Sequence, residues 1–94
     1  MPAPLLFTFD PVKARSNLRK HEISFGEAIT VFRDPLAVTV PDDVHSQEEN
    51  REITCGLSER SRILIVVHTE EVDGRLRILS ARRATAHEQR DYES

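Results

Sequence analysis

The spacing of apolar residues changes along the chain, and each change predicts the border of an element. Apolar residues follow one another from Ile63 to Val67, which predicts a strand over 62–69 that is apolar on both faces and central in a sheet. Alternation at Ile53, Cys55 and Leu57 predicts a half-buried strand with these residues on its buried face. This half-buried strand covers 51–57, and similar runs predict the remaining strands over 5–9, 36–40 and 76–81.

A helix is predicted directly after the first strand. Asp10 is a favourable N-cap, and Pro11 is a favourable first helical residue. Val12 and Leu18 fit the apolar side of one amphipathic helix that ends near His21.

Two capping boxes predict the starts of two further helices. Ser24 with Glu27 precedes a helix over about 25–32, which Asp34-Pro35 ends. Thr85 with Glu88 precedes a short terminal helix that runs to about residue 92.

The order of these elements predicts the fold class. Four consecutive strands joined by short turns favour a mostly antiparallel sheet with helices packed on one face. We therefore expect an α+β fold: a small, mostly antiparallel sheet, two helices in the N-terminal half and a short C-terminal helix. A chain of 94 residues makes one domain, 1–94.

Composition narrows the class of protein. With 38% apolar and 31% charged residues, the chain has the composition of an ordered protein. Its one cysteine, Cys55, excludes an internal disulfide framework, fits a reducing cytosol and is interpreted as a packed core thiol. We expect a cytoplasmic protein without membrane contact, because no signal peptide is visible and the longest apolar run is too short to cross a bilayer.

Charge is distributed unevenly. The net charge of −3 argues weakly against nucleic-acid binding by the molecule as a whole. Basic residues nevertheless gather over 13–20 and 75–83, where a strand runs into Arg82 and Arg83. Placing a charged arginine at the end of a buried strand costs free energy unless an anion pairs with it, so these arginines favour a phosphate-facing site.

Strand alternation divides these arginines. It places Arg77 and Arg83 on one face and Arg82 on the other, unless the strand twists or bulges. The alternative to a phosphate site is a set of ion pairs across the sheet, with Glu70, Glu71 or Glu49 as the partners.

Other chemistry finds little support in the sequence. No cluster of His, Cys and Asp has metal-ligand spacing, and no glycine-rich phosphate loop is present, so we expect no metal and no cofactor. His68 lies among apolar residues, which is typical of a core histidine.

Short motifs follow one another in a characteristic order and spacing over nearly the whole chain. They are Phe9-Asp10 with Lys13, Asn17-Leu-Arg-Lys20-His21, Ser24-Phe25, Ala28, Val31-Phe32, Asp34-Pro35, Glu49, Arg51, Gly56, Val67-His-Thr69, Arg77-Ile-Leu-Ser-Ala-Arg-Arg-Ala84, Glu88 and Tyr92. Together these motifs resemble the BrnT family. Where the family usually has glycine after Lys-His, this chain has Glu22, and where it usually has tryptophan, this chain has Phe9.

The resemblance implies a ribonuclease toxin of a bacterial type II toxin–antitoxin module, with a RelE-like fold, that blocks translation by cutting RNA. It also implies a BrnA-like antitoxin as partner, in a heterotetramer built on an antitoxin dimer. The antitoxin would repress the shared promoter, so the toxin would reach DNA only through it.

Metal-independent RNA cleavage needs a base, cations for the charged phosphorane and an acid for the leaving oxygen. His21 could be the acid or base, or simply a cap of the helix C-terminus. Glu49 and Arg51 could act as base and clamp, or form an ordinary surface ion pair. The catalytic candidates are Lys20, His21, Glu49, Arg51, Arg77 and Arg82, and the candidates for RNA binding are Arg83 and Lys13.

Two other functions compete with this interpretation. The first is a non-catalytic interaction module whose sheet docks a partner chain. The second is direct DNA binding, a weakly supported hypothesis because neither a helix-turn-helix nor a basic recognition helix is visible in the sequence.

Overall fold

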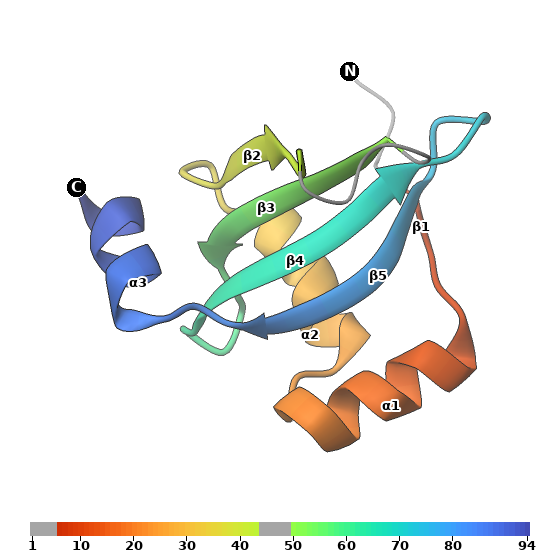
Figure 1. Ribbon diagram of the computed structural model, residues 1–94, viewed down its shortest axis with the longest axis horizontal. Helices are drawn as coiled ribbons and strands as arrows, with labels where there is room; N and C mark the ends of the chain where they lie inside the picture. The colour runs from red at the N-terminus through yellow and green to blue at the C-terminus, as the bar shows by residue number, and fades with distance from the viewer. Residues whose placement is uncertain (1–5, 44–49) are drawn as a thin grey trace.

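The computed structural model describes residues 6–43 and 50–94, which form one five-stranded sheet with helices around it (Figure 1). The strand order is β1-β5-β4-β3-β2, so the predicted central strand, β4, lies in the middle. The strands are β1 (Phe7–Thr8), β2 (Val38–Pro41), β3 (Arg51–Leu57), β4 (Ile63–Glu70) and β5 (Leu76–Arg83).

The α+β class is confirmed, but the sheet is mixed. The strands from β2 to β5 pair antiparallel, as expected. β1 instead pairs parallel with β5, with Phe7 opposite Leu76. The helical segments of the N-terminal half lie between β1 and β2 in the sequence, so the chain can return and place β1 beside β5 in the same direction.

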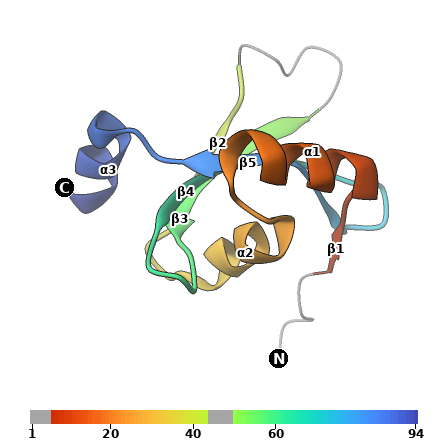
Figure 2. The ribbon, with the colours of Figure 1, turned by 90° about the horizontal axis from the view of Figure 1, so that it is seen from below.

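The helices take three different positions around the sheet. They are α1 (Pro11–His21), α2 (Phe25–Thr30), the 3₁₀ helix η1 (Val31–Arg33) and α3 (Ala86–Glu93). Both ribbon views show α2 against one face of the sheet and α1 beside β5 at its edge (Figures 1 and 2). α3 lies beyond the end of β5 and has no buried residue. We call the face opposite α2 the open face.

The limits of α1 agree with the prediction. The Asp10 carboxylate accepts a hydrogen bond of 2.9 Å from the backbone N–H of Val12. The helix ends at Glu22, which has φ 60° and ψ 27° and donates its backbone N–H to the Leu18 carbonyl. A left-handed residue after the last turn is the usual helix stop, although glycine normally occupies it.

The predicted apolar side of α1 is wrong. Val12 and Leu18 are 62% and 51% exposed, whereas the buried residue of the helix is Asn17, which is 6% exposed. The deepest contact of the helix is therefore made by a polar side chain, and the small residue Ala14 packs against the core beside it.

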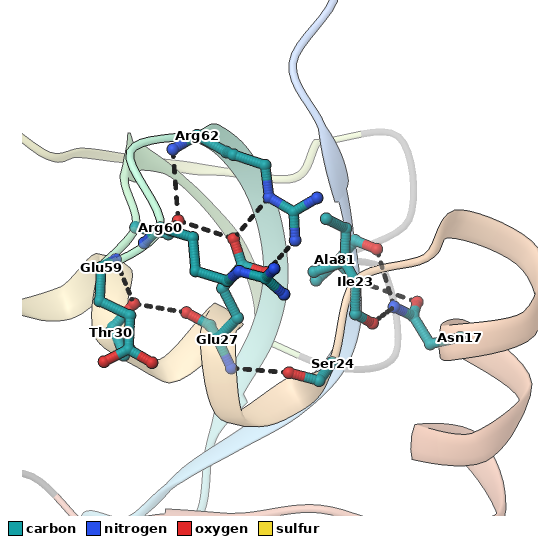
Figure 3. Close-up of polar contacts among 10 residues, drawn as sticks. Asn17, Ile23, Ser24, Glu27, Thr30, Glu59, Arg60, Arg62 and Ala81 are labelled. Atoms are coloured by element: carbon teal, nitrogen blue, oxygen red, sulfur yellow. Dashed lines mark hydrogen bonds and ion pairs between the residues drawn. The ribbon is translucent and has the colours of Figure 1, made fainter.

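The second predicted helix is shorter than expected and has half of its capping box. It is α-helical only to Thr30 and then tightens into η1. Ser24 accepts the backbone N–H of Glu27, but the Glu27 side chain instead bonds Ser58 and Arg62 (Figure 3). These bonds join α2 to the turn between β3 and β4. The box at Thr85 and Glu88 is complete.

The core fills the space between α2, η1 and the sheet, and β3 meets it with the face opposite to the predicted one. Thr54 and Gly56 are buried, while Leu57 is exposed. A Cβ on Gly56 would lie 2.8 Å from Val31 Cγ1 and 2.9 Å from Ala37 Cβ, so only glycine fits under η1. The buried cluster is Ile23, Phe25, Ala28, Val31, Leu64, Val66, Ile78 and Ala81.

Candidate nucleic-acid interface

Register places two of the candidate arginines on the open face together. Arg77 pairs with Thr69 and Arg82 pairs with Ile65, and alternation puts Thr69 and Ile65 on one face of β4. The register shifts between Val67 and His68, which leaves one extra residue in β5 between the two arginines. The bulge therefore reverses the expected parity: Arg82 shares the face of Arg77.

The same register separates Arg83 from this pair. Arg83 pairs with Leu64, whose side chain belongs to the buried cluster on the α2 side. The expectation that Arg77 and Arg83 share a face is therefore wrong, because it assumed an unbroken strand.

Arg51 lies in line with Arg77 across the sheet. Thr69 of β4 pairs with Arg51 on one side and with Arg77 on the other. Since directly paired residues lie on the same face, the two arginines are both on the open face, with β4 between them. The predicted partner of Arg51, Glu49, lies outside the described residues.

The candidate site residues of α1 lie together at a hollow between α1 and β5. Its volume is about 180 Å³, and Lys13, Lys20 and His21 line it from α1. Ser80, which follows the bulge, lines it from β5. Ser80 pairs with Val67, so it is in the open-face row between Arg77 and Arg82. The remaining lining residues are Ser16, Asn17 and Leu79.

Asn17 holds the two walls of this hollow together, and sequence reasoning did not assign it a role. Its side-chain amide donates to the carbonyls of Ile23 and Ala81 at 2.9 and 2.8 Å, and its oxygen accepts the Ala81 N–H at 3.1 Å (Figure 3). The side chain thus satisfies the free backbone edge of β5 as a neighbouring strand would. An asparagine inside a helix was the available signal, because its helix propensity is low.

Carboxylates already pair with the two open-face arginines of β5, Arg77 and Arg82. Arg82 binds Glu88 of α3 through both terminal nitrogens, at 2.8 and 3.0 Å. The hydrogen bonds from Arg82, above all, lower the pKa of Glu88 to about 2. Arg77 lies 3.7 Å from Glu71, one of the predicted partners, whereas Glu88 was not predicted as a partner of Arg82.

The cations of the hollow differ from these arginines in their surroundings. Among residues 6–43 and 50–94, no carboxylate forms an ion pair with Lys13, Lys20 or His21. All three side chains are exposed. The positive charge of the interface is therefore least compensated at the hollow.

Two residues with reactive side chains lie elsewhere. Cys55 is half-buried on the open face rather than packed in the core, and burial followed by the charges of Glu88 and Asp34 raises its pKa. A protonated thiol is a poor nucleophile. His68 is a core histidine, as predicted: it is 2% exposed and its Nε2 lies 2.7 Å from the Thr54 hydroxyl.

Neither a metal-ligating cluster nor a membrane-spanning helix is found among the described residues. No group of three or more His, Cys, Asp or Glu residues among them could hold a metal ion. No helix in this part of the chain is long and apolar enough to cross a membrane.

The fold and the hollow define a small α+β protein with a cationic surface at the edge of a mixed sheet. The chain belongs to the family of BrnT ribonuclease toxins of type II toxin–antitoxin systems, whose family model matches residues 9–88. The predicted resemblance is thus confirmed, and a toxin of this kind implies an antitoxin partner. In this chain the open face carries Arg51, Arg77 and Arg82, which we call the arginine row, and the hollow lies between α1 and β5.

A solved structure supports the fold. The chain resembles the crystal structure of the Brucella abortus ribonuclease toxin BrnT with a TM-score of 0.68 at 19% sequence identity. The match covers 87% of this chain and 99% of the Brucella chain. No curated protein matches the chain by sequence.

Proposed function

We propose that the chain is an endoribonuclease that cleaves RNA by attack of a 2′-hydroxyl on the adjacent phosphate, without a metal ion. Its membership of a ribonuclease toxin family supports the activity. The position of Ser80, which lies in the row between Arg77 and Arg82 and also lines the hollow, is the observation that supports this surface as the site of the activity.

Each chemical task has a candidate on this surface. Arg77 and Arg82 present planar cations to the charged phosphorane, which their permanent charge suits. Lys20 contacts the phosphate, and His21, next to it, moves a proton as acid or base. Arg51 extends the cationic row across β4.

The three remaining assignments differ in their support. Lys13 binds RNA from the wall of the hollow. Arg83 is on the α2 side of the sheet, so it is left out of the interface. Glu49 stays a candidate base whose position lies outside the described residues.

The proposed biological setting follows from the family. We propose that the protein acts in the cytoplasm, inhibits translation and is neutralised by a BrnA-like antitoxin, which alone contacts promoter DNA. The complex is a heterotetramer built on an antitoxin dimer. A relation to the RelE fold belongs to the same proposal.

One specific observation favours a second function, that of a non-catalytic interaction module. Arg77 and Arg82 are both engaged by carboxylates, as structural arginines would be. In this alternative the open face only docks a partner chain.

Inducible expression in a bacterial host separates the two functions. If the chain is a ribonuclease, its expression alone should arrest growth with loss of RNA, and co-expression of the neighbouring gene should restore growth. Purified protein should cut RNA in the presence of a chelator and leave 2′-O-methylated RNA intact. A soluble, folded protein that leaves growth and RNA unchanged would support the interaction module.

A further inference from the structure

The hollow between α1 and β5 is distinguished by the charges that line it. Two other hollows in the described part of the molecule each include a pair of carboxylates: Asp34 and Glu59 in one, Glu52 and Glu70 in the other. The hollow at α1 has none, although the chain contains 16 acidic residues. Its electrostatic character therefore favours an anion.

Helix geometry directs three polar side chains of α1 toward this hollow. Lys13, Ser16 and Lys20 are three and seven positions apart, the spacing of one helix face. All three line the hollow. The helix thus contributes two cations and a hydroxyl donor to one site.

The β-bulge brings a second hydroxyl to the same place. Ser80 follows the extra residue of β5, lines the hollow and lies in the row between Arg77 and Arg82. Within the described residues, no protein group forms a hydrogen bond with the Ser80 hydroxyl, and Asn17 uses its own amide to hold α1 on Ala81. The hydroxyl is therefore free to donate to a ligand, and the walls around it are fixed.

We propose that this hollow binds one phosphodiester of single-stranded RNA, with Ser80 and Ser16 as hydrogen-bond donors and Lys13 and Lys20 as the charges. The proposal rests on the proposed function, which supplies RNA as the ligand. It adds two serines whose hydroxyls bind and position the strand and take no part in the bond-breaking step. A phosphodiester suits the site because its two free oxygens accept several donors at once.

The test is binding of a single-stranded oligoribonucleotide methylated at every 2′-oxygen, which cannot be cleaved by 2′-hydroxyl attack. Fluorescence anisotropy gives its affinity over a range of salt concentrations. Lys20→Ala should weaken binding and lower the slope of log affinity against log salt by about 0.7, the value for one phosphate contact on a single strand. Ser80→Ala should weaken binding roughly tenfold without changing the slope, because a hydroxyl carries no charge.

Arg19→Ala is the matched control. Arg19 is an exposed cation next to Lys20 in the sequence, but it does not line the hollow. Its removal should leave the slope unchanged. If Ser80→Ala lowers the melting temperature strongly, Ser16→Ala tests the other hydroxyl with the same expected result.

The outcomes separate this proposal from the proposed function. Equal slopes for Lys20→Ala and Arg19→Ala, or wild-type affinity after serine substitution, would overturn the phosphate site even in a protein that cuts RNA. Weaker binding of the antitoxin with unchanged RNA affinity would assign the hollow to the partner and overturn it as well. A protein that binds the methylated RNA as predicted but never cleaves would keep the site and reject the nuclease.

Discussion

Glu22 has a backbone conformation that suits glycine better. Its φ of 60° lies in the left-handed region, where a Cβ contacts the following carbonyl oxygen. The resemblance noted in the sequence leads one to expect glycine after the Lys-His pair, and this geometry fits that expectation, because glycine is the usual residue after a helix C-terminus. The carboxylate also lies at the negative end of the helix dipole.

Glu22→Gly should therefore raise the free energy of unfolding by roughly 0.5–1 kcal/mol, the relief of strain less the added entropy of the unfolded chain. Urea denaturation measures this. Glu22→Ala is the control, since it removes the charge and keeps the Cβ. A glycine variant no more stable than the alanine variant would show that the left-handed conformation costs nothing here.

Arg82 is the residue at which the catalytic and structural interpretations disagree most. Its side chain is 42% exposed and binds the side chain of Glu88, which is 29% exposed, so the pair adds only about 0–1 kcal/mol to stability. Arg82→Ala should therefore change the melting temperature little. In a cleavage assay it should lower the rate roughly a hundredfold or more, because a donor to the developing charge is lost.

Glu88→Gln is the informative companion variant. Glutamine can still close the capping box with Thr85, but it no longer neutralises Arg82. The catalytic interpretation predicts cleavage that is unchanged or faster. Equal losses of stability in both variants, with no change in cleavage, would instead make Arg82 a structural residue.

At the scale of the elements, local signals predicted more than contacts between distant residues. The limits of α1 and the capping box of α3 were correct because each depends on residues within one turn. Alternation located β3 but not its buried face, since that face is decided by the close approach of η1 to Gly56.

In the candidate site, too, local features could be predicted from the sequence, whereas features that depend on contacts between distant residues could not. The types of residue and their positions along the chain could be read from the sequence, together with the two basic segments that carry them. The bulge before Ser80 and the attachment of Asn17 to Ala81 could not, because both depend on the register of β5 against its neighbours. Glu88 was missed as the partner of Arg82 because α3 folds back only after the strand ends.

Three strands are joined by a row of polar side chains that reaches the core. The Thr39 and Thr54 hydroxyls lie 2.7 Å apart, and Thr54 lies 2.7 Å from His68 Nε2. The other ring nitrogen of His68, Nδ1, is buried and has no hydrogen-bond partner within the described ranges. The centroids of the His68 and Phe32 rings lie 5.0 Å apart in an edge-on arrangement. Burial lowers the pKa of His68 below its ordinary value of 6.5.

This pKa shift predicts a pH dependence of stability. Below pH 6.5 the unfolded chain protonates this histidine while the folded protein resists, so the free energy of unfolding should fall as the pH decreases from 6.5 toward the lowered pKa. Urea denaturation over that interval should show the decline, and His68→Phe should remove most of it. An identical decline in the variant would place its origin in other groups.

At the scale of the whole molecule, the cationic surface is carried by a protein with a net charge of −3. Attraction to a polyanion is therefore a property of one edge of the sheet and falls off with distance as salt screens it. The same edge presents exposed cations to any partner. The open face adds exposed apolar side chains at Val38 and Val40, on the edge strand β2.

These features predict how the antitoxin binds. An inhibitor that covers Lys20, His21 and Arg77 should carry acidic residues there and apolar anchors elsewhere. The association rate should fall as salt rises, because screening weakens steering, while the complex stays tight through the buried anchors. Co-purification with the product of the neighbouring gene, followed by light scattering, should give the mass of two toxins on an antitoxin dimer. A toxin that remains monomeric beside its soluble neighbour, even at low salt, would contradict this assembly.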